Sequence, residues 1–126
     1  MASWTTDELK KIEAAEELSI ASLRADGTLR NPVTIWVVRA GDNLYVRSVN
    51  GRNSGWFRGV QAHHEGQIRA GGVTKDVALE EISADNEINK QLDTAYATKY
   101  RRYAKSIIDH INSAGARAAT IKLNPH

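Results

Sequence analysis

The stretch VTIWVVRAGDNLYVRSVNGRNSGW, residues 33–56, contains the strongest structural signals of this 126-residue chain. Residues 33–39 are mostly β-branched or aromatic, and such residues favour a β-strand. A Gly-Asp-Asn turn at residues 41–43 leads into a second expected strand at residues 44–49. The polar, glycine-containing segment that follows ends this strand. We therefore expect two adjacent strands here, joined by a tight turn.

Upstream of this stretch the sequence predicts one helix and one strand. Thr5 and Glu8 have the spacing of a capping box, in which two side chains satisfy backbone N–H groups at a helix start. We therefore expect a helix at residues 6–16 and, from the alternating pattern, a strand at residues 18–23. Asp26-Gly27 is typical of a tight hairpin turn, because such a turn requires positive φ. The sequence thus predicts a hairpin with the next strand.

Downstream of residue 56 the sequence predicts two helices and three strands. Apolar residues recur at three- and four-residue steps over residues 88–111, as in one long amphipathic helix with a buried face. Asp85 is the expected N-cap of this helix and Gly115 its expected end. The other expected elements are a short helix at residues 55–62 and strands at residues 67–70, 73–82 and 118–123.

The order of these elements predicts the fold class. It runs helix, three strands, helix, two strands, helix, strand. Six strands in so short a chain suit one core better than two, so we expect a single domain over residues 1–126. A closed or nearly closed sheet removes exposed strand edges. The predicted fold is therefore mostly β, a six-stranded barrel with flanking helices.

The composition narrows the chemistry that this chain can perform. It contains no cysteine, which excludes disulfides, thiolate metal sites, iron–sulfur ligation and a cysteine nucleophile. Its apolar runs are far shorter than the roughly 20 residues that span a bilayer, and its start lacks a basic and apolar leader. We therefore expect a cytoplasmic protein with no membrane partner. His63 and His64 are adjacent and would point apart, so we expect no metal site.

Positive charge is concentrated in the middle of the chain. Residues 28–75 hold seven basic and two acidic side chains, whereas acidic side chains dominate residues 1–27. Such a segment favours an anionic ligand, and a solvated basic face has the same signature. We expect no nucleic-acid partner, because binding of single strands needs aromatic side chains for base stacking, and few lie near these basic residues.

The predicted anion site lies where the strand at residues 44–49 ends and the next helix begins. The first N–H groups of a helix have no internal partner and bear partial positive charge, so they attract anions. Asn53 or Ser54 is the expected N-cap. Gly55 lets a phosphate approach the backbone, and Arg52 adds a two-pronged donor. A capped helix with solvated arginines is the interpretation without a ligand. The other members of the predicted site are Arg47, Ser48 and Arg58.

Six stretches of the chain also form a recognisable set: TTDEL, DGT, PVTIWVVRAGDNLYVRSVNGRNSGW, GQIRAGG, DTAYATKY and ATIKLNP. With them the chain resembles the uncharacterised DUF2255 family, which belongs with the FMN-binding split barrels. The resemblance covers nearly the whole chain. It implies a six-stranded split β-barrel of the FMN-binding type and a homodimer with the cofactor at the interface. The wider superfamily includes pyridoxamine phosphate oxidases, flavin reductases and deazaflavin-dependent reductases.

The resemblance also assigns roles to individual residues. It implies that the strand around Thr34, Ile35 and Trp36 lies along the cofactor ring, partly through backbone groups. Arg52 matches the phosphate-binding arginine of these proteins. Asn53 stands where pyridoxamine phosphate oxidases have a second basic residue, and deazaflavin reductases often have lysine there.

The sequence and the resemblance together predict a flavin- or deazaflavin-dependent oxidoreductase that acts on a small molecule. FMN is the expected cofactor and a deazaflavin the alternative. The cofactor performs the hydride chemistry, so the protein mainly orients its ring; Thr34, Trp36 and Ser48 are candidates for the ring edge. A place in the barrel core is the stronger interpretation of Trp36, and packing of the short helix against the barrel is the stronger interpretation of Trp56. Lys99 is expected at the cofactor mouth, the dimer partner or a rim salt bridge. The alternative function is non-catalytic binding of a flavin or another planar anionic ligand, such as haem.

Overall fold

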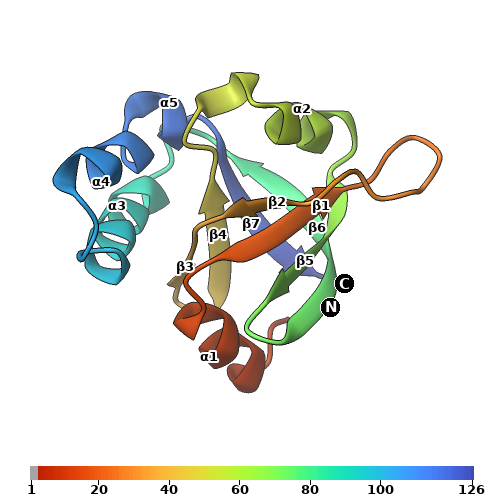
Figure 1. Ribbon diagram of the computed structural model, residues 1–126, viewed down its shortest axis with the longest axis horizontal. Coiled ribbons are helices and arrows are strands. Elements are labelled where there is room, and N and C mark those ends of the chain that lie inside the picture. The colour runs from red at the N-terminus through yellow and green to blue at the C-terminus, as the bar shows by residue number, and fades with distance from the viewer. Residues whose placement is uncertain (1–2) are drawn as a thin grey trace.

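The computed structural model describes residues 3–126, which form an antiparallel sheet curved into a nearly closed barrel with helices around it (Figure 1). The strands are β1 (Leu18–Ser22), β2 (Val33–Ile35), β3 (Val37–Ala40), β4 (Asn43–Arg47), β5 (Glu65–Ala70), β6 (Val73–Ile82) and β7 (Thr120–Pro125). Their order in the sheet is β2-β1-β5-β6-β7-β4-β3, and neighbouring strands are antiparallel. The predicted fold class is confirmed, with seven strands in place of the six expected.

The seventh strand arises because the expected strand at residues 33–39 is divided at Trp36. Before this residue, β2 pairs with β1, where Thr34 lies opposite Ser19. After it, β3 pairs with β4 from Val37 onward. β2 and β3 are thus the two edges of the sheet although they are neighbours in the chain. One extended segment turns a corner at Trp36 and serves both edges, which brings the barrel close to closure.

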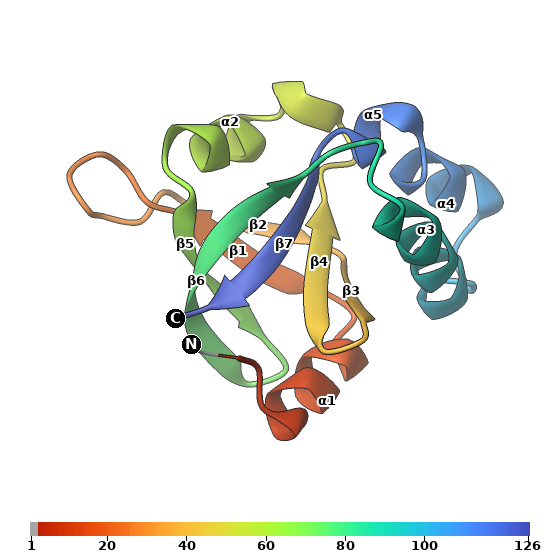
Figure 2. The ribbon, with the colours of Figure 1, turned by 180° about the vertical axis from the view of Figure 1, so that it is seen from behind.

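Helices cover the barrel at opposite ends (Figures 1 and 2). At one end lies α1 (Thr6–Ala14), and its capping box is confirmed. The Thr5 hydroxyl accepts from the Glu8 N–H at 3.1 Å, and the Glu8 carboxylate accepts from the Thr5 N–H at 2.9 Å. At the other end lies α2 (Gly55–Ala62), which has the predicted bounds and follows the short 3₁₀ turn η1 (Gly51–Asn53).

The hairpin predicted around Asp26-Gly27 is confirmed in part: Leu23 and Leu29 pair across the turn in an antiparallel bridge, whereas the regular β1–β2 ladder starts only at Ile20 and Val33. The turn itself is present: Gly27 has φ of 86°, and the Asp26 carboxylate accepts from the N–H and hydroxyl of Thr28. This turn belongs to a loop that projects from the barrel (Figure 1). The turn residues therefore predict where the chain reverses, but not the gap between the Leu23–Leu29 bridge and the β1–β2 ladder.

The expected long helix is three helices, α3 (Ile88–Lys99), α4 (Lys105–Ile111) and α5 (Ala114–Arg117). Asp85 does not cap it, since Glu87 is the N-cap residue, and Gly115 lies inside α5. The break after α3 lets α4 turn back, so that Ile111 joins the buried cluster of α3. Ile107, which the periodicity placed on the buried face, is 46% exposed.

Two buried clusters hold these elements together. The first fills the barrel and includes side chains from α1 and α2, and the second lies between the outer faces of β3 and β4 and the helices α3 and α4. Successive side chains of a strand point to opposite faces of the sheet, so neighbouring residues belong to different clusters. Val37 and Val46 belong to the first cluster, and Val38 and Tyr45 to the second. No helix among residues 3–126 has the length and apolar character needed to cross a bilayer.

Candidate functional site

A groove with a volume of about 290 Å³ runs beside the edge strand β2. We call it the β2 groove. It lies between β2, the segment that leaves β4, the start of α2, and α4. Its lining consists of residues 33–36 and 47–50 together with Ser54, Trp56, Ile107 and Ile111.

The structure brings most of the predicted site residues together in this groove. Gly55 lies in an adjoining hollow, whereas Arg52, Asn53 and Arg58 line neither space. The members that the groove unites come from two segments of the chain, β2 with its corner and the end of β4 with the start of α2. They are Thr34, Ile35, Trp36, Arg47, Ser48 and Ser54.

β2 offers the groove an unpaired strand edge. Within residues 3–126 it pairs with β1 on one side only, so the backbone N–H and C=O groups of its other side have no ladder partner there. The exposed side chain of Thr34 adds a hydroxyl beside these groups. A strand edge of this kind can form main-chain hydrogen bonds with the polar edge of a flat ligand.

Trp36 forms a fixed wall of the groove. Its ring stacks on Tyr100 with a centroid distance of 3.8 Å and an interplanar angle of 4°, and Tyr103 lies at 4.9 Å. The Tyr100 hydroxyl donates to the Glu16 carbonyl oxygen at 2.7 Å and accepts from the Val37 N–H at 3.2 Å. Burial raises the pKa of Tyr100, so this hydroxyl stays neutral. The expected place of Trp36 in the barrel core is wrong, because its ring packs on Tyr100 at the end of α3, outside the barrel.

Two serine hydroxyls meet in the groove. The Oγ atoms of Ser48 and Ser54 lie 2.8 Å apart. Ser54 is the N-cap of α2, as predicted, and its hydroxyl accepts from the Phe57 N–H at 3.4 Å. The Ser48 N–H donates to the Ala119 carbonyl oxygen at 3.0 Å, which anchors the segment leaving β4. Because a hydroxyl both donates and accepts, the pair can reorient its hydrogens toward a ligand.

Arg47 lines the groove, but its guanidinium is hydrogen-bonded to other residues of the protein. The side chain is buried and donates to the Asp93 carboxylate at 2.7 Å, the Asn89 side-chain oxygen at 2.9 Å and the Asn112 side-chain oxygen at 3.0 Å. Nε donates to the Thr120 hydroxyl at 3.1 Å. These bonds join β4 to α3, β7 and the end of α4. A buried charge needs such partners, so Arg47 stabilises one side of the groove.

Arg52 lies outside the β2 groove. Its guanidinium donates to the Ala118 carbonyl oxygen at 2.8 Å and to the Glu81 carboxylate at 3.3 Å. Glu81 also pairs with His64 at 2.7 Å, and this hydrogen bond is the main reason that the pKa of Glu81 is lowered. The guanidinium also lies over the Phe57 ring, 5.3 Å from its centroid. The expected convergence of Arg52 and the start of α2 on one anion is not present in this arrangement.

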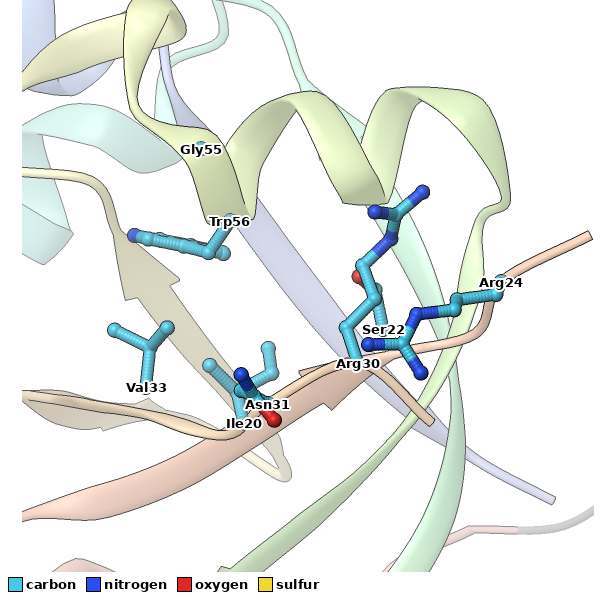
Figure 3. Close-up of a pocket in the computed structure, with 8 residues that line it drawn as sticks. All are labelled: Ile20, Ser22, Arg24, Arg30, Asn31, Val33, Gly55 and Trp56. Atoms are coloured by element: carbon cyan, nitrogen blue, oxygen red, sulfur yellow. The ribbon is translucent and has the colours of Figure 1, made fainter. Parts of the chain in front are cut away.

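A second hollow, with a volume of about 240 Å³, adjoins the β2 groove, because Val33 and Trp56 line both. We call it the arginine pocket, since Arg24 and Arg30 form part of its lining (Figure 3). Sequence reasoning missed this pocket, because two arginines in a loop have no spacing that signals a ligand. It also favoured packing over ligand contact for Trp56, whose half-buried ring borders two hollows.

Lys99 contributes to neither hollow. Its ammonium donates to the Val37 carbonyl oxygen at 2.7 Å and lies over the Tyr100 ring, 5.2 Å from its centroid. Burial lowers the pKa of Lys99 to about 8. A backbone carbonyl is thus its partner, in place of the expected rim salt bridge, and it lines a separate hollow beside Glu13.

Several solved structures have a similar fold. HutZ, the haem storage protein from Vibrio cholerae, aligns with a TM-score of 0.67 and 17% identity over 96% of this chain and 89% of its own. An F420 reductase aligns with a TM-score of 0.66 and 14% identity over 93% and 91%. A putative pyridoxamine 5'-phosphate oxidase from Listeria innocua aligns with a TM-score of 0.65 and 13% identity over 94% and 90%. At these identities the likeness establishes the fold alone.

Sequence comparison identifies the family. No curated protein sequence is significantly similar to this chain. Residues 8–123 match the profile of a family described as an uncharacterized protein conserved in bacteria, DUF2255. This match confirms the resemblance noted in the sequence. The chain therefore belongs to the DUF2255 family, and it has the split-barrel fold.

Proposed function

We propose that this protein binds a flavin-type cofactor in the β2 groove and uses it to oxidise or reduce a small molecule. The observation that supports this most directly is the combination of surfaces in the groove. An unpaired strand edge at Thr34, the stacked ring of Trp36 and the paired hydroxyls of Ser48 and Ser54 border one space.

The residues of the groove suit a flavin ring system. Such a ring has two apolar faces and one edge of hydrogen-bonding groups. Trp36, Trp56 and Ile107 supply apolar wall, and the β2 backbone with Ser48 and Ser54 supplies donors and acceptors. A bound flavin would supply the hydride chemistry, while these residues bind and orient it. FMN is the first candidate and a deazaflavin the second, because an F420 reductase and a putative pyridoxamine 5'-phosphate oxidase share the fold.

The rim of the groove supports a dimeric arrangement as part of the proposal. Val49 and Ile107 both line the groove, and they are 38% and 46% exposed. Large apolar side chains grouped at a ligand site mark a surface that is covered in the working protein. A second copy of this chain would cover them and close the groove over the cofactor.

Non-catalytic binding of a planar anionic ligand is the second candidate, and the likeness to a haem storage protein favours it. Haem iron is held by side chains such as histidine, methionine, cysteine or tyrosine. The groove residues of the described chain are of other types. This composition favours a flavin over haem, unless a second copy supplies the ligand to the iron.

Absorbance titrations with FMN, F420 and haem test the proposal. We expect one of the two flavins to bind and to be reduced by a nicotinamide donor or another hydride source. Thr34→Arg places a long side chain at the exposed strand edge and should abolish binding without disturbing the core. The matched control is Thr74→Arg, at an exposed threonine on β6 that does not line the groove. If neither flavin binds, or if both variants bind equally well, the proposal is wrong; binding without turnover would leave the storage function.

A further inference from the structure

We infer that the arginine pocket binds an oxyanion, the phosphate or carboxylate group on the arm of the ligand whose ring occupies the β2 groove. The inference rests on the function proposed above, and it places the negative charge of the ligand at Arg30 instead of Arg52. Neither the sequence nor the family resemblance indicates this location.

Arg30 has hydrogen-bonding capacity that the protein does not use. Its Nε is completely buried and has no hydrogen-bond partner within residues 3–126. Buried polar groups nearly always have a partner, so an unused donor needs an explanation. No carboxylate of the described chain pairs with Arg30, whereas Arg47 and Arg52 each pair with one. Because Nε itself is enclosed beneath α2, the outer N–H groups of the same guanidinium are the donors that an oxyanion in the pocket would meet.

Arg24 places a second positive charge in the same pocket. The only hydrogen-bond partner of its guanidinium in the described part of the chain is the Leu29 carbonyl oxygen, at 3.2 Å. In Figure 3 the side chains of Arg24 and Arg30 lie on one side of the hollow and Trp56 on the other. Two guanidinium groups in one hollow repel each other, and an anion between them removes that repulsion. The planar donors of arginine also match the oxygens of phosphate and carboxylate groups.

The absence of a side chain at Gly59 lets α2 pack directly on the Arg30 side chain. A Cβ at Gly59 would lie 3.0 Å from both Cδ and Nε of Arg30 and 2.5 Å from the Ser22 hydroxyl oxygen. α2 therefore passes so close to Arg30 that a residue with a side chain would displace its stem. The backbone N–H of Arg30 also donates to the Ser22 carbonyl oxygen at 2.9 Å. A guanidinium restrained in this way loses little further freedom when an anion binds.

The pocket and the groove are arranged for one ligand. Val33 and Trp56 border both, so a ring in the groove and an anionic arm in the pocket would lie on the two sides of these residues. Gly55 and Trp56 form the first turn of α2, where N–H groups lack helical partners and the field favours negative charge. This field favours an anion in addition to the charges of the two arginines.

Titrations with FMN and riboflavin test the inference, because the two ligands share a ring and differ in the phosphate. We expect the wild-type protein to prefer FMN by about tenfold or more, as for one charge-assisted pair. Arg30→Gln should remove this preference and leave riboflavin affinity unchanged, and Arg30→Lys should retain part of it. The control is Arg101→Gln, an exposed arginine after α3 that bonds only to the Thr98 carbonyl oxygen. An unchanged preference in Arg30→Gln would overturn the inference.

Gly59→Ala separates position from charge. It keeps both arginines but should displace the Arg30 stem, so we expect it to weaken FMN binding while riboflavin binding persists. Circular dichroism and thermal melting of each variant would establish that the barrel is intact. Equal FMN affinity in folded Gly59→Ala and wild-type protein would contradict the restrained geometry.

Small anions, phosphate and succinate, test the pocket without any flavin. In ¹⁵N-labelled protein, saturable shifts of the Gly55, Trp56 and Asn31 amides on adding phosphate or succinate should be absent in Arg30→Gln. A stronger response to phosphate identifies a phosphate arm, and a stronger response to succinate a carboxylate arm. If anions bind but no flavin does, the proposed function is wrong and the anion site stands. If FMN binds with the same affinity in the wild-type protein and Arg30→Gln, this inference is wrong and the proposed function stands. No saturable shift with either anion would also overturn it.

Discussion

Arg47 lines the β2 groove and Arg30 the adjoining arginine pocket, yet their surroundings differ completely. Arg47 is buried at the end of β4 and has a carboxylate, two amide oxygens and a hydroxyl as acceptors. Arg30 lies in the loop between β1 and β2, and its buried Nε has no acceptor in the described part of the chain. Both arginines are charged and line a hollow, so neither property distinguishes them. The number of acceptors within the protein does: a structural arginine has several, and an arginine available to a ligand has few.

The largest effect is expected for Arg47→Met. The substitution leaves the Asp93 carboxylate and the Asn89 and Asn112 side chains without their shared donor. Breaking a buried ion pair on one side typically destabilises a protein by about 3–5 kcal/mol, a large part of the stability of a small domain. Chemical denaturation measures this loss, with Arg101→Met as an exposed control within about 0.5 kcal/mol. A loss no larger than that of the control would show that the Arg47 network does not hold the fold.

Asp93→Asn should have a smaller effect of the same sign. It retains the shape of the side chain but removes the negative charge that faces Arg47 and Arg117. Hydrogen bonds to charged groups contribute about 1.5–3 kcal/mol, and the amide and hydroxyl acceptors of Arg47 remain. The free energy of unfolding, compared with that of Arg47→Met, therefore separates the contribution of the charge from that of the acceptor count. Equal losses in the two variants would mean that the charge alone matters.

Lys99 is an intermediate case, a partly buried cation whose partner is one backbone carbonyl. Its folded-state pKa, about 8, lies below the ordinary 10.5 because of burial. At and below pH 8 the charged form is penalised in the folded state. Between about pH 8 and pH 10.5 the unfolded chain binds more protons, so stability should rise with pH. Lys99→Met should flatten this rise in melts recorded across the range, while Lys90→Met, at an exposed position of the same helix, should not.

The smallest effect on stability is expected for Arg30→Gln. The Nε of Arg30 has no acceptor within residues 3–126, so replacement of this side chain should change the free energy of unfolding by less than about 1 kcal/mol. The same melts with saturating phosphate should stabilise the wild-type protein and leave the variant unchanged, since a ligand stabilises only the state that binds it. A strongly destabilised Arg30→Gln would place Arg30 with Arg47 as a structural residue and remove the contrast between them.

Local signals in the sequence predicted most elements of this fold. The capping box at Thr5 and Glu8 and the serine cap at Ser54 are present in the structure, because they depend on residues only three positions apart. The division of residues 33–39 at Trp36 was not predictable in this way. Val, Thr, Ile and Trp favour extended backbone throughout, and the corner is needed only because the segment must pair with two different neighbours.

The candidate site was predicted in part for the same reason. Thr34, Trp36, Ser48 and Ser54 meet in the groove, since a strand edge and a strand end are brought together by the barrel. Arg52 was expected to join them because it adjoins Ser54 in the chain. Its direction, however, depends on Ala118 and Glu81, which are distant in sequence.

The sequence by itself determined where strands, turns and helix caps form, because those preferences arise from neighbouring residues and short-range sterics. It also established the concentration of positive charge in residues 28–75. Only the tertiary structure decided which of those charges are neutralised. Arg47 finds acceptors on α3, β7 and the end of α4, whereas the Nε of Arg30 lies under Gly59 with no acceptor among residues 3–126. Pairing of a charge depends on residues that only the folded chain brings within hydrogen-bonding distance.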